Sequence, residues 1–251
     1  MKKILFIVLL ILTCLFVKGY SQASIDLLKP KITAEHQVIN HHYYSILYSN
    51  TFRQAYCSYY KLTSSMTDCS LERKDQFAPD SLVTGVKVKP SLYHDSGYDK
   101  GHLVCQADMC FNAKAMTECF YMSNIAPQTH GFNAGIWLSL EKECRVWSGR
   151  KGDLFIFTGG VLTKNEQLLG YTTVIPEEFY KIIVFYNTST KSYESISFLI
   201  PHKNLHDYDL SDYIVTIDAI ELATGVDFLY ALPDNIENAI EKQHAVGNWT
   251  K

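Results

Sequence analysis

The chain has 251 residues, of which 47% are hydrophobic and 20% are charged, and its formal net charge is −3. This composition excludes a disordered chain and is sufficient for one large domain or two small ones. It also excludes a protein that coats nucleic acid through bulk positive charge, so a polyanionic ligand would need a local basic cleft.

Residues 1–23 have the pattern of a secretory signal peptide. A short positive segment, Met1–Lys3, precedes an apolar run at 4–17, and small and polar residues follow where a peptidase could cut. The run of about 14 residues is shorter than the roughly 20 that span a bilayer, which disfavours a transmembrane anchor. Cys14 lies inside the run rather than at its end, which disfavours lipid attachment. We therefore expect residues 24–251 to be secreted or periplasmic, without membrane association after cleavage.

The expected elements of the mature chain are strands interleaved with few helices. Tyr-rich, alternating sequence favours the first two strands, and an apolar or alternating pattern favours the later three. In chain order we predict a polar segment at 24–40, strands at 42–49 and 55–62, an irregular stretch at 75–97, a helix at 133–146, strands at 154–162, 180–186 and 194–200, and a helix at 215–224 ended by Gly225. No repeat or linker divides residues 24–251, so we predict a single α+β domain with a mostly antiparallel sheet.

Six cysteines remain after removal of the signal peptide, and an even number in an exported chain predicts disulfides. Buried free thiols stay open as the alternative, whereas a zinc site is disfavoured because no CxxC pair is present. A bridge from Cys105 to Cys110 would stiffen the segment after His102, and one from Cys57 to Cys69 could close a hairpin. The sequence does not choose among the pairings of Cys57, Cys69, Cys105, Cys110, Cys119 and Cys144.

The most informative segment begins at Asp99-Lys100-Gly101-His102. A histidine near its ordinary pKa is partly neutral at pH 7 and can take a proton from water. Because it has no Cβ, Gly101 allows other groups to approach the backbone closely. Within about forty residues the chain adds an asparagine oxygen at Asn133, suited to Mg²⁺, and a carboxylate at Glu141. A base, a cation, a neutral oxygen ligand and a carboxylate are the groups needed for metal-assisted cleavage of a phosphate ester.

Asn133, Trp137 and Glu141 recur every four residues and would lie along one side of a helix. Glu141 would then be roughly 12 Å along the axis from Asn133, which suits a carboxylate that holds metal-bound waters. Each residue alone could have an ordinary structural role: a satisfied core histidine for His102, a helix N-terminal residue for Asn133 and a solvated helix face for Glu141. Their combination favours the catalytic interpretation.

Three blocks of sequence resemble the DNA/RNA non-specific endonuclease family, the ββα-metal or His-Me finger nucleases that include secreted bacterial nucleases and mitochondrial endonuclease G. The signature Asp-Arg-Gly-His is matched by Asp99–His102, and Ser-Asn-x-x-Pro-Gln by Ser123–Gln128. The Asn-x-Gly-x-Trp block with its following Leu-Glu is matched by Asn133–Trp137 and Leu140-Glu141. The similarity extends over residues 43–233 and implies a ββα-metal active-site motif.

The resemblance implies a role for each matched residue. His102 would be the general base, Asn133 the direct Mg²⁺ ligand and Glu141 a ligand through water. Asn124 would position the site or the phosphate, and Arg73 would contact the phosphate. The metal would stabilise the leaving 3′-oxygen, so that the products carry 5′-phosphate ends.

The resemblance also implies DNA and RNA as substrates, Mg²⁺ as the cofactor with Mn²⁺ able to replace it, and a homodimer as one form of assembly. Lys100 stands where the family has arginine, and we expect this mobile point charge to support lower activity than a bidentate guanidinium. Cys105 and Cys119 also depart from the family pattern, and we expect them to tie the active loop to the next segment. Two other functions stay open: a non-catalytic nucleic-acid-binding protein on the same scaffold, and a phosphodiesterase for another substrate.

Overall fold

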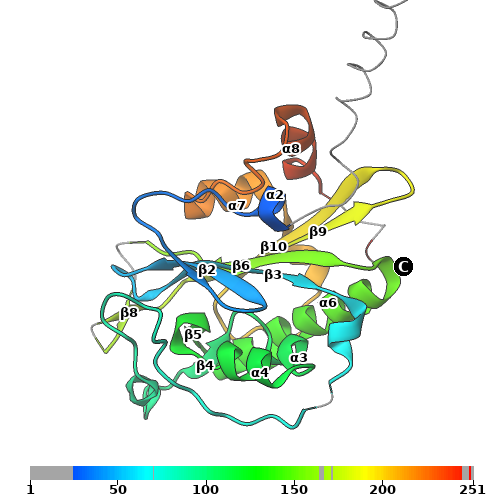
Figure 1. The fold of residues 1–251 in the computed structure, drawn as a ribbon. Coiled ribbons are helices and arrows are strands. Elements are labelled where there is room, and N and C mark those ends of the chain that lie inside the picture. Colours follow the sequence, from blue (N-terminus) through cyan, green and yellow to red (C-terminus); the bar gives the residue numbers. More distant parts are fainter. Residues whose placement is uncertain (1–24, 70, 164–166, 171, 245–248, 250–251) are drawn as a thin grey trace, which may run out of the picture.

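The computed structural model describes residues 25–69, 71–163, 167–170, 172–244 and 249. A seven-stranded sheet with the order β1-β2-β3-β6-β9-β10-β11 runs through the middle of the molecule, and every neighbouring pair is antiparallel (Figure 1). Its strands are β1 (Gln37–Asn40), β2 (Tyr44–Ser49), β3 (Gln54–Leu62), β6 (Leu154–Gly160), β9 (Glu178–Asn187), β10 (Ser192–Pro201) and β11 (Ile214–Val215).

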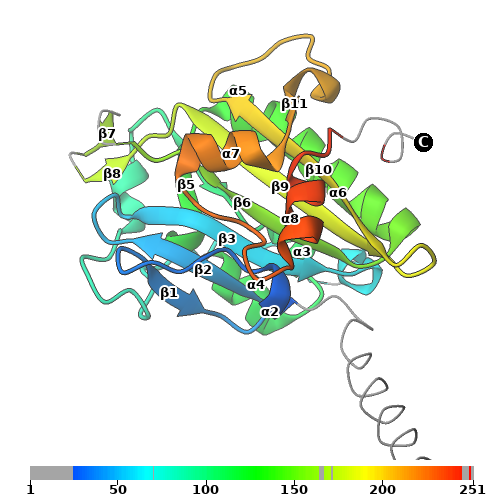
Figure 2. The ribbon, with the colours of Figure 1, turned by 90° about the horizontal axis from the view of Figure 1, so that it is seen from above.

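Helices cover both faces of this sheet. One layer has α3 (Gln106–Met109), α4 (Ala113–Cys119), α5 (His130–Phe132) and α6 (Leu138–Lys151), and the other has α2 (Ile25–Leu28), α7 (Ile217–Thr224) and α8 (Asp234–Glu241). Figure 2 shows α2, α7 and α8 lying over the strands when the molecule is viewed from above. No helix of the described residues is long and apolar enough to cross a membrane.

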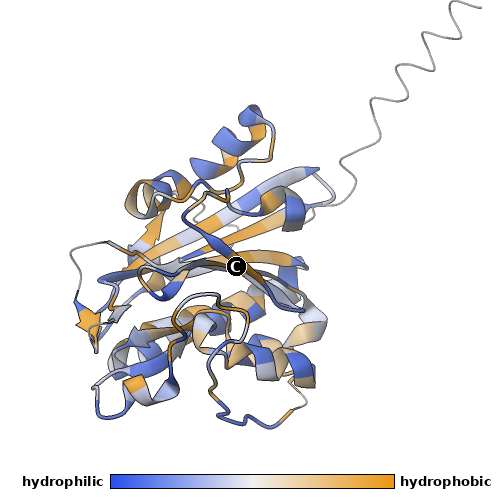
Figure 3. Ribbon diagram, turned by 60° about the vertical axis from the view of Figure 1, so that its left-hand side comes forward, coloured by the Kyte–Doolittle hydropathy of each residue, from blue (hydrophilic) through white to orange (hydrophobic). Residues whose placement is uncertain are grey.

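Side chains of the strands point alternately to the two faces of the sheet, and this explains how one sheet contributes to two hydrophobic cores. In β6, Leu154 and Ile156 pack into the core beneath α6, whereas Phe155 and Phe157 pack into the core beneath α7 and α8. Successive side chains of a strand point to opposite faces, so a strand that is covered on both sides needs apolar residues at every position. The central strands accordingly carry much of the hydrophobic colour in Figure 3.

Two smaller sheets and several short turns complete the fold. The pair β4 (Asp99–His102) and β5 (Ile125–Gln128) is antiparallel, as is the pair β7 (Leu168–Leu169) and β8 (Thr173–Val174). The short 3₁₀ helices are η1 (Ser64–Thr67), η2 (Pro90–Tyr93), η3 (Met122–Asn124) and η5 (Leu210–Tyr213), and η4 (Asn133–Trp137) is a π-helical turn that leads into α6.

The structure confirms the α+β class, the mostly antiparallel sheet and the five predicted strands. Gly225 ends α7 with a φ of 69°, as expected for a residue after a helix. Three expectations were wrong in detail. The polar segment 24–40 contains α2 and β1, and Ile214–Val215 forms an edge strand before α7. The helix predicted at 133–146 is interrupted at Gly135, so the four-residue spacing from Asn133 does not follow a regular α-helix.

The disulfide joins Cys69 to Cys110, which corrects both pairings considered from the sequence. Cys105 and Cys110 stand at opposite ends of α3, and Cys57 points into the core beneath α7 and α8, so neither is placed for the expected bridge. The expected tie through Cys105 and Cys119 is also wrong. These two thiols, with those of Cys57 and Cys144, are free and buried. The signal peptide predicted at 1–23 lies outside the described residues, and the single domain at 24–251 stays a prediction.

Candidate active site

Three contacts hold β4 and the chain after it against η4 and α6. The Asn133 amide donates to Asp99 Oδ2 at 3.0 Å, and the Trp137 ring nitrogen donates to the His102 carbonyl at 3.3 Å. One turn further along α6, Glu141 accepts a hydrogen bond from the Cys105 thiol. The two segments therefore run side by side in the same direction, and this places His102, Asn133 and Glu141 around one site.

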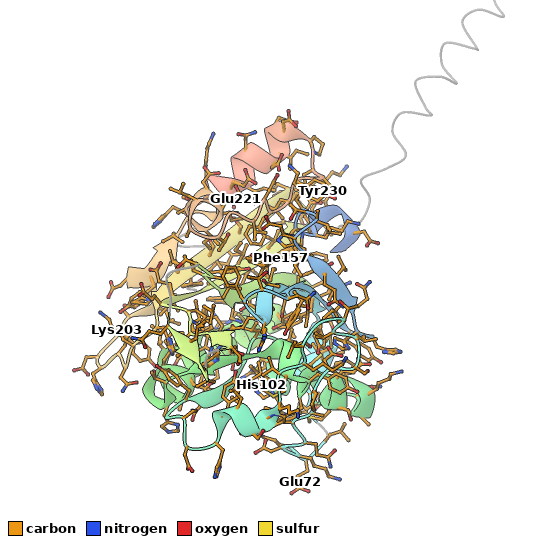
Figure 4. All side chains as sticks on the ribbon, turned by 90° about the vertical axis from the view of Figure 1, so that its left-hand side faces the viewer. Glu72, His102, Phe157, Lys203, Glu221 and Tyr230 are labelled. Carbon is orange, nitrogen blue, oxygen red and sulfur yellow. A yellow bond between two sulfur atoms is a disulfide. The ribbon has the colours of Figure 1, made fainter. Side chains whose placement is uncertain are left out.

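His102 lies in an aromatic setting near the centre of this arrangement, where Figure 4 labels it. Its ring centroid is 5.6 Å from that of Phe77 and 4.8 Å from that of Phe120. Burial, followed by the positive charge of Arg73, lowers the pKa of His102 to about 3. The imidazole is therefore neutral at physiological pH. Its Nε2 is buried without a hydrogen-bond partner in the protein, so this nitrogen can interact with a water or a ligand.

A cation lies over each of the two rings that flank His102. Lys100 Nζ is 5.1 Å from the centroid of Phe77, and the guanidinium carbon of Arg73 is 5.8 Å from the centroid of Phe120. Arg73 also pairs through Nε with Asp75 Oδ1 at 2.7 Å, and its side chain is 55% exposed. These two cations give the site the local positive charge that the acidic chain otherwise lacks.

Asp99 fixes the orientation of the Asn133 side chain. Its Oδ2 accepts from Asn133 Nδ2 and lies 2.9 Å from Nδ1 of the exposed His130. Because the Asn133 amide nitrogen is bound in this way, the amide oxygen faces away from Asp99 and is free to bind a cation.

Glu141 is a buried carboxylate with a raised pKa. Burial raises the pKa to about 7, although the charge of Lys181 lowers it. Lys181 is itself 1% exposed, donates to Thr158 Oγ1 at 3.3 Å and lies 4.4 Å from the Trp137 ring centroid. A carboxyl that titrates near pH 7 in a buried site is typical of functional positions.

Asn124 is fully buried, and both ends of its side-chain amide are hydrogen-bonded to the protein backbone. Its Oδ1 accepts from the Val104 amide at 2.9 Å, and its Nδ2 donates to the carbonyls of Val104 and Cys119 at 3.1 and 3.0 Å. These bonds hold the chain that follows His102 against the chain before η3. Of the two roles expected for Asn124, this geometry suits positioning of the site rather than contact with a phosphate.

Three residues that lie at the site have no role predicted from the sequence. They are Asp99, described above, and Gln128 and His202. The side chain of Gln128 lies where a Cβ on Gly101 would be, which explains the glycine, and both of its amide atoms are buried without partners. His202 accepts from the Thr129 amide at 2.8 Å and donates to the Pro176 carbonyl at 2.8 Å, which anchors the turn before Asn133. Asp99 and Gln128 were present in the matched blocks, but nothing in the sequence links His202 to them.

The residues present fit a hydrated divalent cation. Asn133 offers a neutral oxygen, Glu141 a carboxylate and His102 an unpartnered nitrogen, which suits a hard ion that keeps several waters. Among the described residues, four of the eight buried side-chain nitrogen and oxygen atoms without a partner belong to His102, Gln128 and Thr129. Buried polar atoms are rarely unpaired, so this concentration indicates a place where water, an ion or a substrate supplies the partners.

Comparison with known proteins identifies the family of this chain. The model of the DNA/RNA non-specific endonuclease family matches residues 24–235. A nuclease of Nostoc sp. is 31% identical over 222 residues, covering 85% of this chain and 80% of that protein. A mitochondrial nuclease of Saccharomyces cerevisiae is 30% identical over 71% of this chain and 61% of its own length. A chain of the crystallised EndoG/EndoGI complex shares the fold, with a TM-score of 0.75 and 23% identity over 84% of this chain and 92% of that chain. This chain belongs to the DNA/RNA non-specific endonuclease family.

Proposed function

We propose that the protein is a secreted, metal-dependent endonuclease that hydrolyses phosphodiester bonds of DNA and RNA with little sequence specificity. The observation that carries the proposal is the neutral His102, whose Nε2 is buried without a hydrogen-bond partner. Each of the two rings that flank it carries a cation, and Asp99, on the same strand, orients the amide of Asn133. A neutral imidazole can accept a proton, the cations attract a phosphate, and the amide oxygen can bind a divalent ion.

The proposed mechanism assigns one task to each residue. His102 Nε2 takes a proton from the attacking water. Asn133 would hold the ion directly, and Glu141 would hold its waters. When bound, Mg²⁺, or Mn²⁺ in its place, supplies Lewis acidity that stabilises the leaving 3′-oxygen. Cleavage of the bond between phosphorus and the 3′-oxygen leaves a 5′-phosphate on one product.

The cations and the buried amides would orient the substrate. Arg73 and Lys100 contact the phosphate, because each side chain lies on an aromatic ring beside His102 and keeps charged donors for a ligand. Arg73 also stabilises the charge that develops in the transition state. Asn124 keeps the loop after His102 in place through its bonds to Val104 and Cys119.

Export is supported by the signal-like segment 1–23 and by the disulfide, since disulfides persist in oxidising compartments. Several relatives are named as mitochondrial nucleases. Fractionation of the native host distinguishes the two destinations: a mature chain that starts near residue 24 outside the cytoplasm supports export, and a full-length chain inside the cell contradicts it. A homodimer is a further part of this proposal, and sedimentation of the mature chain tests it.

The decisive experiment is digestion of supercoiled plasmid and of total RNA by the purified mature chain. We expect cleavage of both with Mg²⁺, none with EDTA, and none with His102→Ala. The matched control is His94→Ala, which removes an exposed histidine paired with the neighbouring Asp95 and is expected to keep full activity.

Absence of cleavage by the folded, oxidised wild type with either Mg²⁺ or Mn²⁺ would contradict the proposal. Retention of nucleic-acid binding under those conditions would then favour a binding protein on the nuclease scaffold. Loss of binding as well would direct the search to another phosphodiester.

A further inference from the structure

Three carboxylates meet between α7 and α8, on the face of the sheet opposite His102. Asp218 and Glu221 stand three residues apart on α7, and Glu241 is the last residue of α8. One carboxylate oxygen from each residue lies within 4.8 Å of the other two. Figure 4 labels Glu221 in the upper part of the molecule and His102 in the lower part, with Phe157 of β6 labelled between them, so this cluster is separate from the candidate active site.

Glu241 is the member of the cluster that most needs a partner. The residue is only 7% exposed, and no hydrogen bond or ion pair from a described residue reaches its carboxylate. The charges that act on it most strongly are negative and come from Glu221, Glu237, Asp218 and Asp227. Its place at the C-terminal end of α8 adds the negative end of the helix dipole. A buried carboxylate without compensation is costly, and the cost is relieved by uptake of either a proton or a cation.

The other groups of this region do not supply that cation. Among the described residues, Glu221 accepts from the Phe228 amide alone, at 2.6 Å, which fixes its carboxylate without neutralising it. The nearby Lys31 is paired with Asp227 at 2.9 Å on the exposed surface. Burial and the neighbouring carboxylates together raise the pKa of Glu241 to about 8, and burial raises that of Glu221 to about 7.

We propose that Asp218, Glu221 and Glu241 form a second divalent-cation site, selective for Ca²⁺, which joins α7 to α8. Oxygens that bind one Ca²⁺ lie about 2.4 Å from it, so they are at most about 4.8 Å apart, which the cluster satisfies. Ca²⁺ tolerates irregular geometry and completes its shell with water, whereas Mg²⁺ demands a near-ideal octahedron. Three carboxylates on a partly exposed surface correspond to a Kd of about 0.1–1 mM, the range of extracellular Ca²⁺ sites. This inference does not rest on the proposed nuclease activity.

The test is calorimetric titration of the full mature chain with Ca²⁺, together with thermal unfolding, in an Asn133→Ala background. That substitution removes the direct ligand expected at the candidate active site, so binding there does not contribute. We expect one Ca²⁺ per chain, and a rise in Tm of roughly 5 °C at a concentration well above Kd. Glu241→Gln keeps the shape of the side chain and removes its charge, and it is expected to weaken Ca²⁺ binding at least about tenfold and to abolish the shift in Tm.

Glu237→Gln is the matched control, because it removes the same charge from the same helix but none of the three ligands. We expect it to retain the site and most of the affinity. The proposal is overturned if the Asn133→Ala chain takes up no Ca²⁺, or if the two glutamine variants lose affinity equally, since general screening of negative charge would then explain the effect. Equal stabilisation by Mg²⁺ that persists in Glu241→Gln would overturn it as well.

Discussion

Lys100 stands where the family signature has arginine, and its ammonium lies over the Phe77 ring at 5.1 Å. A guanidinium at the same place would stack on that ring and offer two parallel donors to a phosphate, whereas an ammonium offers one mobile charge. We therefore expect Lys100→Arg to raise kcat/KM on plasmid DNA by roughly 2- to 10-fold. The control is Lys87→Arg at an exposed position, which should leave kcat/KM on plasmid DNA unchanged. Loss of activity in Lys100→Arg would contradict this expectation.

Glu141 gives the candidate metal site a pH dependence. Burial raises its pKa to about 7, so in the free protein the carboxyl is mostly protonated at pH 6 and mostly ionised at pH 8. Only the ionised form accepts hydrogen bonds from metal-bound waters without competition from a proton, so the affinity for Mg²⁺ should fall as pH falls through 7. Titration of Mg²⁺ binding at pH 6, 7 and 8 checks this, and Glu141→Gln should flatten the profile. A wild-type affinity that is constant over this range would show that Glu141 does not act on the ion.

At the scale of elements, Asp80 joins the start of the β-sheet to the segment that carries Asn124. Its Oδ2 lies 3.1 Å from His41 Nε2 and accepts from Ser123 Oγ at 2.5 Å, while its Oδ1 accepts from the Leu82 amide at 2.8 Å. Burial raises the pKa of Asp80, but the hydrogen bonds from His41 and Ser123 outweigh it, so the pKa is lowered. The ionised carboxylate therefore stabilises the folded chain above the ordinary aspartate pKa, and this stability is lost as pH falls through the folded value.

We expect Asp80→Asn to lower the free energy of unfolding at pH 7 by about 1–3 kcal/mol, because at least one buried donor loses its acceptor. The difference from the wild type should shrink as pH falls below the ordinary aspartate pKa, and it should be smallest below the lowered pKa of the folded state, where the wild-type carboxyl is protonated too. Urea unfolding from pH 3 to pH 7 measures both effects. Asp95→Asn, at a side chain that is 88% exposed, is the control. A difference that stays constant over this pH range would mean that the charge of Asp80 is not what stabilises the fold.

The elements also show how far the sequence could predict this structure. The long strands β3, β9 and β10 were predicted because apolar or Tyr-rich runs of that length are typical of buried strands. The four-residue strands β4 and β5 were not, because Gly101 and Pro127 are poor strand formers and the pairing joins segments far apart in the chain. For the candidate site, His102, Asn124, Asn133 and Glu141 received roles from the matched blocks, whereas Asp99 and Gln128 lie in the same blocks and received none. The burial of Lys181 beneath Trp137 was not, since tertiary packing alone determines it.

For the molecule as a whole, the bridge from Cys69 to Cys110 closes a loop between residues 41 positions apart. The loop includes Arg73, and the Leu71 amide donates to the Cys110 carbonyl at 3.3 Å close to the bridge. Such a cross-link stabilises mainly by restricting the unfolded chain. The double variant Cys69→Ser/Cys110→Ser should therefore lower the free energy of unfolding by about 2–4 kcal/mol and should reduce activity through a less ordered Arg73.

Thermal unfolding with and without DTT provides the control for this prediction. Reductant should lower the Tm of the wild type toward that of the double variant, and it should leave the variant unchanged because Cys57, Cys105, Cys119 and Cys144 are already free. If DTT changes neither the Tm nor the rate of cleavage by the wild type, the bridge is not important for stability or activity.

The seven-stranded sheet ends in two short strands, and this limits how two copies of the chain could associate. β1 has four residues and β11 has two, whereas the interior strands β9 and β10 have ten each. An edge of two to four residues offers few free backbone groups to a second chain, which protects against aggregation through added strands. A homodimer of this protein would therefore have to pack through side chains on its helical or loop surfaces, rather than through a sheet continued from one copy into the next.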